Sequence, residues 1–255
     1  MRVELTVSGF LDNISFNDDE IDSVHLPILR KISNLVRVGK ERVVVLFAGP
    51  PGSGKSTTAA LWEFLSLHDT SLEDVQHLSI DGFHFPNTYL NTHSLKKDGK
   101  LIGLHEIKGA PETYNVEALI QTVHQLRNSN LLWPEYDRKL HDPGENQISV
   151  TAPIVVVEGN WVLFRQEPWN NLAKLADFTI IIEADEPVLK HRLIERKLRG
   201  GFSEEFVQEH YRKADQPNIN LVMNDSCKAD VVLELEKKNI LTMKSFRKKH
   251  FSDTP

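Results

Sequence analysis

One stretch decides the fold of this chain: Val43-Val44-Val45-Leu46-Phe47-Ala48, followed by Gly49-Pro50-Pro51-Gly52-Ser53-Gly54-Lys55-Ser56-Thr57. The apolar first part is typical of a buried strand. The second part fits the pattern G-x-x-x-x-G-K-[ST], in which glycines let successive backbone N–H groups point at a phosphate. The residues after it continue as an expected helix, whose positive N-terminal end favours the same anion. We therefore expect residues 49–57 to bind a nucleoside triphosphate, with Lys55 on the β- and γ-phosphates and the Ser56 hydroxyl on Mg²⁺.

The composition is that of a soluble globular protein. Of 255 residues, 40% are hydrophobic and 26% are charged, and the net charge of −6 gives no electrostatic reason to expect a nucleic-acid partner. The single Cys227 excludes an internal disulfide and suits a reducing compartment. No apolar run approaches the roughly 20 residues of a membrane helix, and the charged N-terminus does not resemble a signal peptide. We expect a cytoplasmic protein without a membrane partner.

Two further apolar runs each end in a carboxylate. Strands are expected at Val75–Ile80, which is followed by Asp81, and at Ile154–Phe164, which carries Glu158. Acidic residues at the carboxyl ends of parallel strands lie where open α/β sheets bind ligands. By position alone, Asp81 is equally a turn former and a catalytic base. A buried Glu158 without a partner would be costly, which favours a functional role. With the phosphate-binding loop, the two carboxylates predict a Mg²⁺-nucleotide site with an acid/base group.

The flanking segments carry weaker signals. Residues 1–17 alternate and predict a short hairpin or an irregular arm, followed by a helix that Pro27 kinks or delays. Residues 131–142 predict a strand that runs into a polar loop with Tyr136, Arg138 and His141. This loop either holds a small polar substrate or is a surface loop with solvated charges.

The C-terminal third predicts strands and helices in alternation. Strands are expected at Phe178–Glu183 and, as the last strand, at Ala229–Leu235. Between them lie an expected helix Glu186–Arg199 and a second one from Ser203 to about Asp215, which Pro217 ends. The first of these helices carries Arg192 and Arg196, which share a face because they are four residues apart. The basic tail that follows is expected to be a solvated end, with a membrane or partner contact as the weaker alternative.

Taken together, these motifs resemble the P-loop small-molecule kinases grouped as phosphoribulokinase, uridine kinase and bacterial pantothenate kinase. The resemblance covers roughly residues 43–235 and rests on four motifs in the family's order. They are Asp81-Gly82-Phe83 with Pro86-Asn87; Lys108-Gly109-Ala110-Pro111-Glu112-Thr113-Tyr114-Asn115; Pro134-x-Tyr136-Asp137-x-x-x-His141; and Val157-Glu158-Gly159-Asn160.

The resemblance implies a three-layer α/β domain of the P-loop NTPase fold, with a mostly parallel sheet. Residues 1–255 would form a single P-loop kinase domain with a helical lid at about 192–220. Residues 1–40 would be an N-terminal extension and residues 237–255 a basic tail. The implied cofactors are ATP and Mg²⁺. Family relatives are often dimers, so a homodimer is one expected assembly.

The resemblance also implies roles for single residues. Asp81 would take the proton from the substrate hydroxyl, while Ser56 and Glu158 would organise Mg²⁺. Arg192 and Arg196 fall where the family has lid arginines that neutralise charge on the moving phosphoryl group. A solvated helix face with Glu195 as partner is the alternative for this pair. The implied substrate contacts are His84, Tyr136, Arg138 and His141.

The chain departs from the family's patterns at the substrate positions. Arg138 stands where uridine kinases carry an aromatic residue against which the base packs, and Asp142-Pro143 follows where they have an arginine. A cation at position 138 favours an acceptor with negative charge or several hydroxyls, such as a sugar, a sugar acid or a pantothenate-like carboxylate. The alternatives are a uridine or cytidine kinase, and a P-loop ATPase that acts as a regulatory switch.

Overall fold

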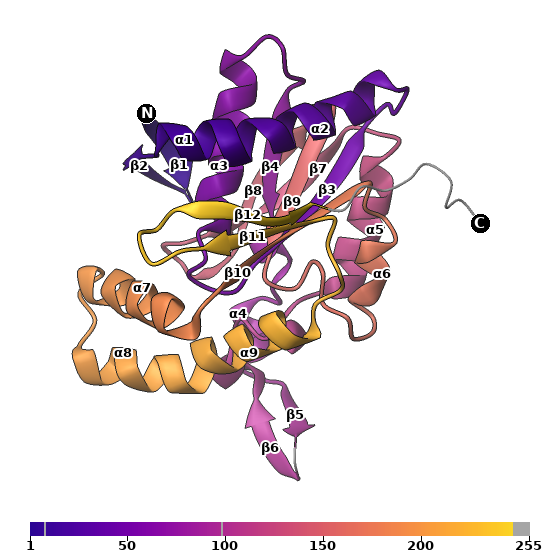
Figure 1. Ribbon diagram of the computed structural model, residues 1–255. Helices are drawn as coiled ribbons and strands as arrows, with labels where there is room; N and C mark the ends of the chain where they lie inside the picture. The colour runs from indigo at the N-terminus through magenta and orange to yellow at the C-terminus, as the bar shows by residue number, and fades with distance from the viewer. Residues whose placement is uncertain (8, 98, 247–255) are drawn as a thin grey trace.

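The computed structural model describes residues 1–7, 9–97 and 99–246 of the chain. In these residues a central sheet has six strands in the order β12-β11-β10-β3-β9-β4 (Figure 1). The strands are β3 (Val43–Ala48), β4 (Val75–Ser79), β9 (Ile154–Gly159), β10 (Phe178–Ala184), β11 (Val231–Leu235) and β12 (Leu241–Phe246). All neighbours pair in parallel except β11 and β12, which are antiparallel. The predicted α/β fold with a mostly parallel sheet is confirmed.

Helices cover both faces of this sheet. Along β3, alternate side chains enter two different apolar cores, one with helices α2 and α3 and one with α5 and α6. This gives the predicted three layers, and Figure 1 shows α2 and α3 together on one side of the sheet. The helices are α1 (Asp18–Glu20), α2 (Leu26–Arg37), α3 (Lys55–His68), α4 (Asn87–Leu90), α5 (Val116–Leu126), α6 (Asn170–Ala173), α7 (Glu186–Arg199), α8 (Glu204–His210) and α9 (Gln216–Asp225). No helix in the described segments is long and apolar enough to cross a bilayer.

Three antiparallel hairpins stand outside the central sheet in the described part of the chain. They are β1 (Arg2–Val7) with β2 (Phe10–Ser15), β5 (Ser94–Lys97) with β6 (Lys100–Gly103), and β7 (Leu131–Asp137) with β8 (Asp142–Val150). Residues 1–17 therefore form a hairpin and not an irregular arm. Strand β8 was missed, because its residues are mostly polar and it pairs with β7 alone.

The prediction that Pro217 ends a helix is wrong. Helix α8 passes through a wide π-helical turn, Tyr211–Asp215, and continues as α9 to Asp225. Pro217 occupies the first turn after this wide turn, where a missing backbone N–H is tolerated. The same arrangement occurs before α2, where a π-helical turn Ile21–His25 precedes Pro27.

Two strand boundaries also differ from the expectations. The last described strand is β12, which lies inside the expected tail 237–255. It buries Leu241, and Lys244 bridges the carboxylates of Glu183 on β10 and Glu234 on β11. The basic run from Arg247 lies outside the described residues. Strand β9 ends at Gly159, earlier than expected, although the apolar residues after it are buried too.

Candidate active site

The loop between β3 and α3 has the geometry of a phosphate cradle. Gly52 and Gly54 adopt left-handed backbone conformations, with φ of 81° and 91°, which favour glycine. A Cβ atom on Gly52 would lie 2.9 Å from Leu193 of α7. The Ser53 hydroxyl is buried and has no hydrogen-bond partner among the described residues. A buried polar group without a partner is costly, so this loop fits a bound phosphate.

Glu158 and Ser56 meet beside this loop, as the sequence predicted they would. Strands β3 and β9 are neighbours in register, with Phe47 opposite Glu158, and the Ser56 hydroxyl donates to the carboxylate at 2.8 Å. Burial raises the pKa of Glu158, while the charge of Lys55 opposes this shift. Burial lowers the pKa of Lys55, against the attraction of Glu158 and then Asp81. These buried groups of opposite charge favour each other's charged forms.

The donor set also fits Mg²⁺. No group of three or more His, Cys, Asp or Glu side chains in the described segments forms a metal cage. Mg²⁺ in kinases usually takes one or two protein oxygens and completes its shell with waters and phosphates. The hydroxyl of Ser56 and the carboxylate of Glu158 are such a pair.

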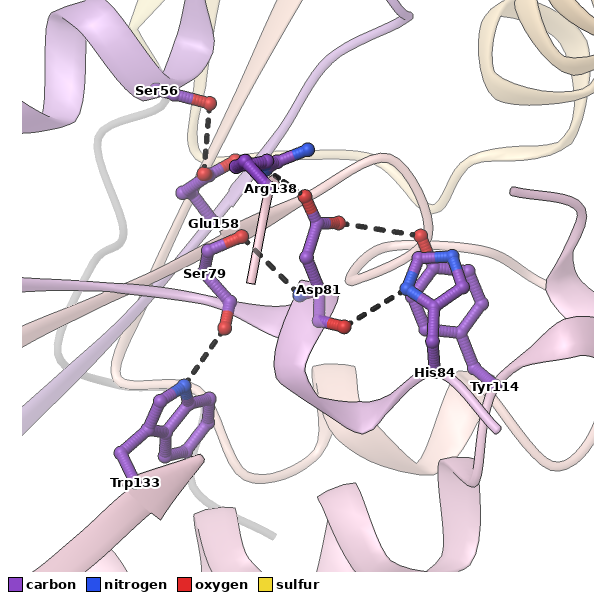
Figure 2. Close-up of polar contacts among 8 residues, drawn as sticks. All are labelled: Ser56, Ser79, Asp81, His84, Tyr114, Trp133, Arg138 and Glu158. Atoms are coloured by element: carbon purple, nitrogen blue, oxygen red, sulfur yellow. Dashed lines mark hydrogen bonds and ion pairs between the residues drawn. The ribbon is translucent and has the colours of Figure 1, made fainter. Parts of the chain in front are cut away.

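Asp81 lies at the end of the next strand, in a single turn of 3₁₀-helix, Ile80–Phe83, that follows β4. Its carboxylate forms an ion pair with Arg138 and accepts a hydrogen bond from the Tyr114 hydroxyl at 3.4 Å (Figure 2). Burial alone would raise the pKa of Asp81, but the charges of Arg138, His84 and Lys55, together with the Arg138 hydrogen bond, outweigh it and lower that pKa below its usual value. Asp81 is therefore an ionised carboxylate at neutral pH.

A glycine follows each carboxylate because another element passes close by. A Cβ atom on Gly82 would lie 2.0 Å from the carbonyl oxygen of Pro134 on β7. A Cβ atom on Gly159 would lie 2.3 Å from Ile80. The close approach of β7 brings Tyr136 to the site, and the guanidinium of Arg138 lies 5.0 Å from the Tyr136 ring centre.

Two predicted substrate residues, His84 and His141, have different surroundings. The His84 ring is nearly buried between Tyr114 and Tyr136, and its Nδ1 donates to the Asp81 carbonyl at 2.9 Å. His141 is exposed and does not line the cavities around Asp81. It adopts a left-handed conformation, and its carbonyl accepts from the side chain of Asn87 at 3.0 Å. The structure thus brings His84 to the site but not the side chain of His141.

Two cavities meet at this cluster. One, of about 450 Å³, is lined by Ser56, Asp81, Tyr136, Arg138 and Glu158 among others. The second, which we call the phosphate cavity, has a volume of about 600 Å³. It is lined by Arg138, Arg192 and Arg196 and by the loop residues Gly52, Gly54, Lys55, Ser56 and Thr57. Arg192 is partly buried and donates to Asn239 at 2.9 Å. Arg196 is exposed, and Glu195 lines the same cavity, so the alternative of a solvated helix face still applies to Arg196. Ser56 and Arg138 line both cavities and therefore stand at their junction.

Two parts of the site were not assigned from the sequence. Tyr114 was quoted within a family motif but received no role, although its hydroxyl reaches Asp81. Residues of the β1–β2 hairpin line both cavities. The hairpin carries no motif, and its alternating pattern indicates a strand but not its neighbours.

Comparisons with known proteins agree with this geometry. The model of the phosphoribulokinase/uridine kinase family matches residues 44–241. Uncharacterized protein YggC of Escherichia coli (strain K12) is 39% identical over 236 residues, which are 92% of this chain and 96% of that protein. Putative uridine kinase C227.14 of Schizosaccharomyces pombe is 27% identical over 202 residues, 76% of this chain and 84% of that protein. The structure of a putative fructose transport system kinase from Silicibacter sp. TM1040 superimposes with a TM-score of 0.70 at 26% identity, covering 80% of this chain and 98% of that one.

Proposed function

The chain belongs to the phosphoribulokinase/uridine kinase family, and we propose that it transfers the γ-phosphoryl group of ATP to a hydroxyl group of a small metabolite. One observation carries this proposal: Asp81 lines a cavity that meets the phosphate cavity at Ser56 and Arg138. A phosphate-binding loop alone suffices for hydrolysis or for a conformational switch. A carboxylate and a second cavity beside it are what a kinase needs in addition.

The residues of the loop and of α7 would hold the nucleotide. Lys55, the loop amides and the Ser53 hydroxyl would bind the β- and γ-phosphates. The Ser56 hydroxyl and Glu158, directly or through water, would hold the Mg²⁺ that neutralises phosphate charge when bound. Arg192 and Arg196 line the opposite wall of the same cavity, and they would stabilise the charge of the transferred group.

Asp81 would accept the proton of the acceptor hydroxyl. Its lowered pKa keeps it ionised, as a general base must be. The Tyr114 hydroxyl and Arg138 hold the two oxygens of its carboxylate, so the acceptor would replace one of these contacts when it binds.

The cavity of about 450 Å³ that Asp81 lines, here called the acceptor cavity, favours a polar and small substrate. Arg138, paired with Asp81, adds a positive charge to a lining that also carries carboxylates, and Tyr136 offers a ring face that this guanidinium already covers. The carboxylates of the lining are those of Glu4, Glu63, Asp81, Glu135 and Glu158. We expect a sugar, a sugar acid or a pantothenate-like carboxylate. The solved relative, a putative fructose transport system kinase, is in line with a sugar acceptor.

The test is ATP turnover measured by coupled ADP release against matched acceptors. Glycerate and glycerol, gluconate and glucose, and pantothenate and pantothenol differ within each pair by the carboxylate, and fructose, uridine and cytidine complete the panel. Stimulation by a sugar, a sugar acid or pantothenate is the expected result. Stimulation by uridine or cytidine alone would make the protein a nucleoside kinase, and hydrolysis that no acceptor alters would make it an ATPase.

A further inference from the structure

The N-terminal hairpin extends along the whole active-site cleft. A third cavity, of about 560 Å³, shares Gly54, Thr57, Arg192 and Asn239 with the phosphate cavity. Residues of the N-terminal segment line all three cavities. The acceptor cavity is lined by Glu4, Leu5 and Thr6, and the phosphate cavity by Val7, Phe10, Asp12 and Ile14. The third cavity is lined by Ile14, Ser15, Phe16, Asn17 and Glu20. This segment precedes residue 44, where the family match begins.

The hairpin is fixed in this position by packing and by its ends. Val3 and Leu5 are buried in the core that contains α3. The Met1 amino group binds the Asp18 carboxylate at 2.6 Å, and the Phe16 amide donates to the Met1 carbonyl at 2.8 Å. The wall of the cleft therefore exists before any ligand binds.

The strand alternation decides which side chains of β2 face the phosphate cavity. Asp12 pairs with Leu5 across the hairpin, and Ile14 pairs with Val3. Directly opposite residues of an antiparallel pair share a face, so Asp12 and Ile14 lie on the face that packs toward α3. Leu11 and Asn13 lie on the outer face and line none of these cavities.

Asp12 is exposed, and it is a charged member of an inner face whose other members are apolar. Its side chain makes no ion pair or hydrogen bond with any described residue. The cations that line the same cavity are Lys55, Arg138, Arg192, Arg196 and Arg199. A carboxylate repels phosphate groups, so its place in a nucleotide cavity suits a different part of the ligand. In dinucleotide-binding α/β folds, a carboxylate hydrogen-bonds a ribose hydroxyl.

We propose that the inner face of the β1–β2 hairpin is the ribose-binding wall of the nucleotide site. Asp12 accepts hydrogen bonds from the 2′- and 3′-hydroxyls of the ribose, and Phe10 and Ile14 pack against the sugar. Ile14 lines both the phosphate cavity and the third cavity, so the ribose lies between the phosphates at Lys55 and a base in the third cavity. This inference rests on the proposed function, because it requires a nucleotide at the P-loop.

The experiment compares the affinities for MgADP and for the magnesium complex of 2′,3′-dideoxy-ADP by isothermal titration calorimetry. Hydrogen bonds to a charged group are worth about tenfold or more in affinity. Wild type should therefore prefer MgADP by about this factor, and Asp12→Ala should lose the preference. Asn13→Ala is the matched control, since Asn13 is exposed on the outer face of the same strand and should leave the preference unchanged.

A second matched pair tests the packing against the sugar. Phe10 and Leu11 are 58% and 66% exposed and are adjacent, but only Phe10 faces the phosphate cavity. Phe10→Ser should weaken the binding of both nucleotides, and Leu11→Ser should not.

The possible results separate this inference from the proposed function. Equal affinity of wild type for the two nucleotides, or a preference that survives in Asp12→Ala, would overturn the ribose assignment while leaving a kinase intact. A preference that depends on Asp12, in a protein that no acceptor stimulates, would support the ribose wall and contradict the kinase. Failure of wild type to bind MgADP would overturn both.

Discussion

Asp81 and Glu158 both lie near the carboxyl ends of neighbouring strands, Asp81 just after β4 and Glu158 within β9, yet their surroundings are opposite. Glu158 is 3% exposed, its pKa is raised by burial, and it contacts the Ser56 hydroxyl. Asp81 is 23% exposed, and although burial acts on it too, Arg138 lowers its pKa. The element that packs beside each strand end makes the difference, α3 in one case and β7 in the other. Environments that separate two carboxylates in this way also separate their roles.

The largest expected effect is that of removing the base. Asp81→Asn should lower kcat by about 10²- to 10⁴-fold, as is typical when general base catalysis is lost. The affinity for MgADP should not change, because the phosphate cavity stays intact. Steady-state kinetics with the best acceptor and calorimetry with MgADP measure the two quantities. A kcat close to that of wild type would show that Asp81 is not the general base, and the proposed division of roles between Asp81 and Glu158 would be wrong.

Glu158→Gln should act on the other half of the site. The Mg²⁺ concentration required for half-maximal activity should rise by about 10- to 100-fold, as when a partner of a metal ligand is lost. Activity at saturating Mg²⁺ should recover in part, because the base is still present. If Glu158→Gln alters kcat but not the Mg²⁺ requirement, the proposed role of Glu158 in holding Mg²⁺ is wrong.

Arg138→Gln should move the pH dependence of the reaction. Without the guanidinium, burial raises the pKa of Asp81 without opposition from its main cationic partner, so the base is protonated at a higher pH than in wild type. The acid limb of the kcat/KM profile should therefore shift upward, and the KM for the acceptor should rise.

The control for this shift is Lys139→Gln, which removes an exposed positive charge from the adjacent position. It should leave the acid limb where it is in wild type. An unchanged limb in Arg138→Gln would mean that the ion pair does not set the pKa of the catalytic base.

The smallest effect expected here concerns the close approach of β7 to Asp81. Gly82→Ala places a methyl group against the Pro134 carbonyl, and overpacking of this kind costs about 1–3 kcal/mol. The melting temperature should fall by about 2–4 °C per kcal/mol in a domain of this size. Gly144→Ala is the control, since its nearest neighbour would be the Glu135 carbonyl at an ordinary 3.5 Å. Equal melting temperatures for the two variants would contradict this explanation of Gly82.

The half of the site around Glu158 was accessible from the sequence, because each of its parts is a local pattern. An apolar strand, a glycine-rich loop and a second apolar strand that ends in a carboxylate predict both the sheet and the meeting of Ser56 with Glu158. The half around Asp81 depends on long-range packing. Arg138, the ion-pair partner of Asp81, lies 57 residues further along the chain. It belongs to the loop of the β7–β8 hairpin, whose second strand is mostly polar.

Other features escaped prediction for similar reasons. Pro217 normally ends a helix, and the π-helical turn that accommodates it has no recognisable sequence pattern. The hairpin of residues 1–15 carries no motif, and its neighbours depend on the burial of Val3 and Leu5 beside α3. Strand β12 alternates weakly, and its Lys244 pairs with two carboxylates on the surface of the sheet.

The most direct test of the central claim is the fate of the γ-phosphoryl group of ATP. ADP, inorganic phosphate and phosphorylated acceptor are measured together, with and without the acceptor that stimulates turnover most. The account predicts that ADP release depends on the acceptor, that each ADP is matched by one phosphorylated acceptor, and that Asp81→Asn abolishes this product. Release of ADP with an equal amount of inorganic phosphate, unaffected by any acceptor or by Asp81→Asn, would contradict it.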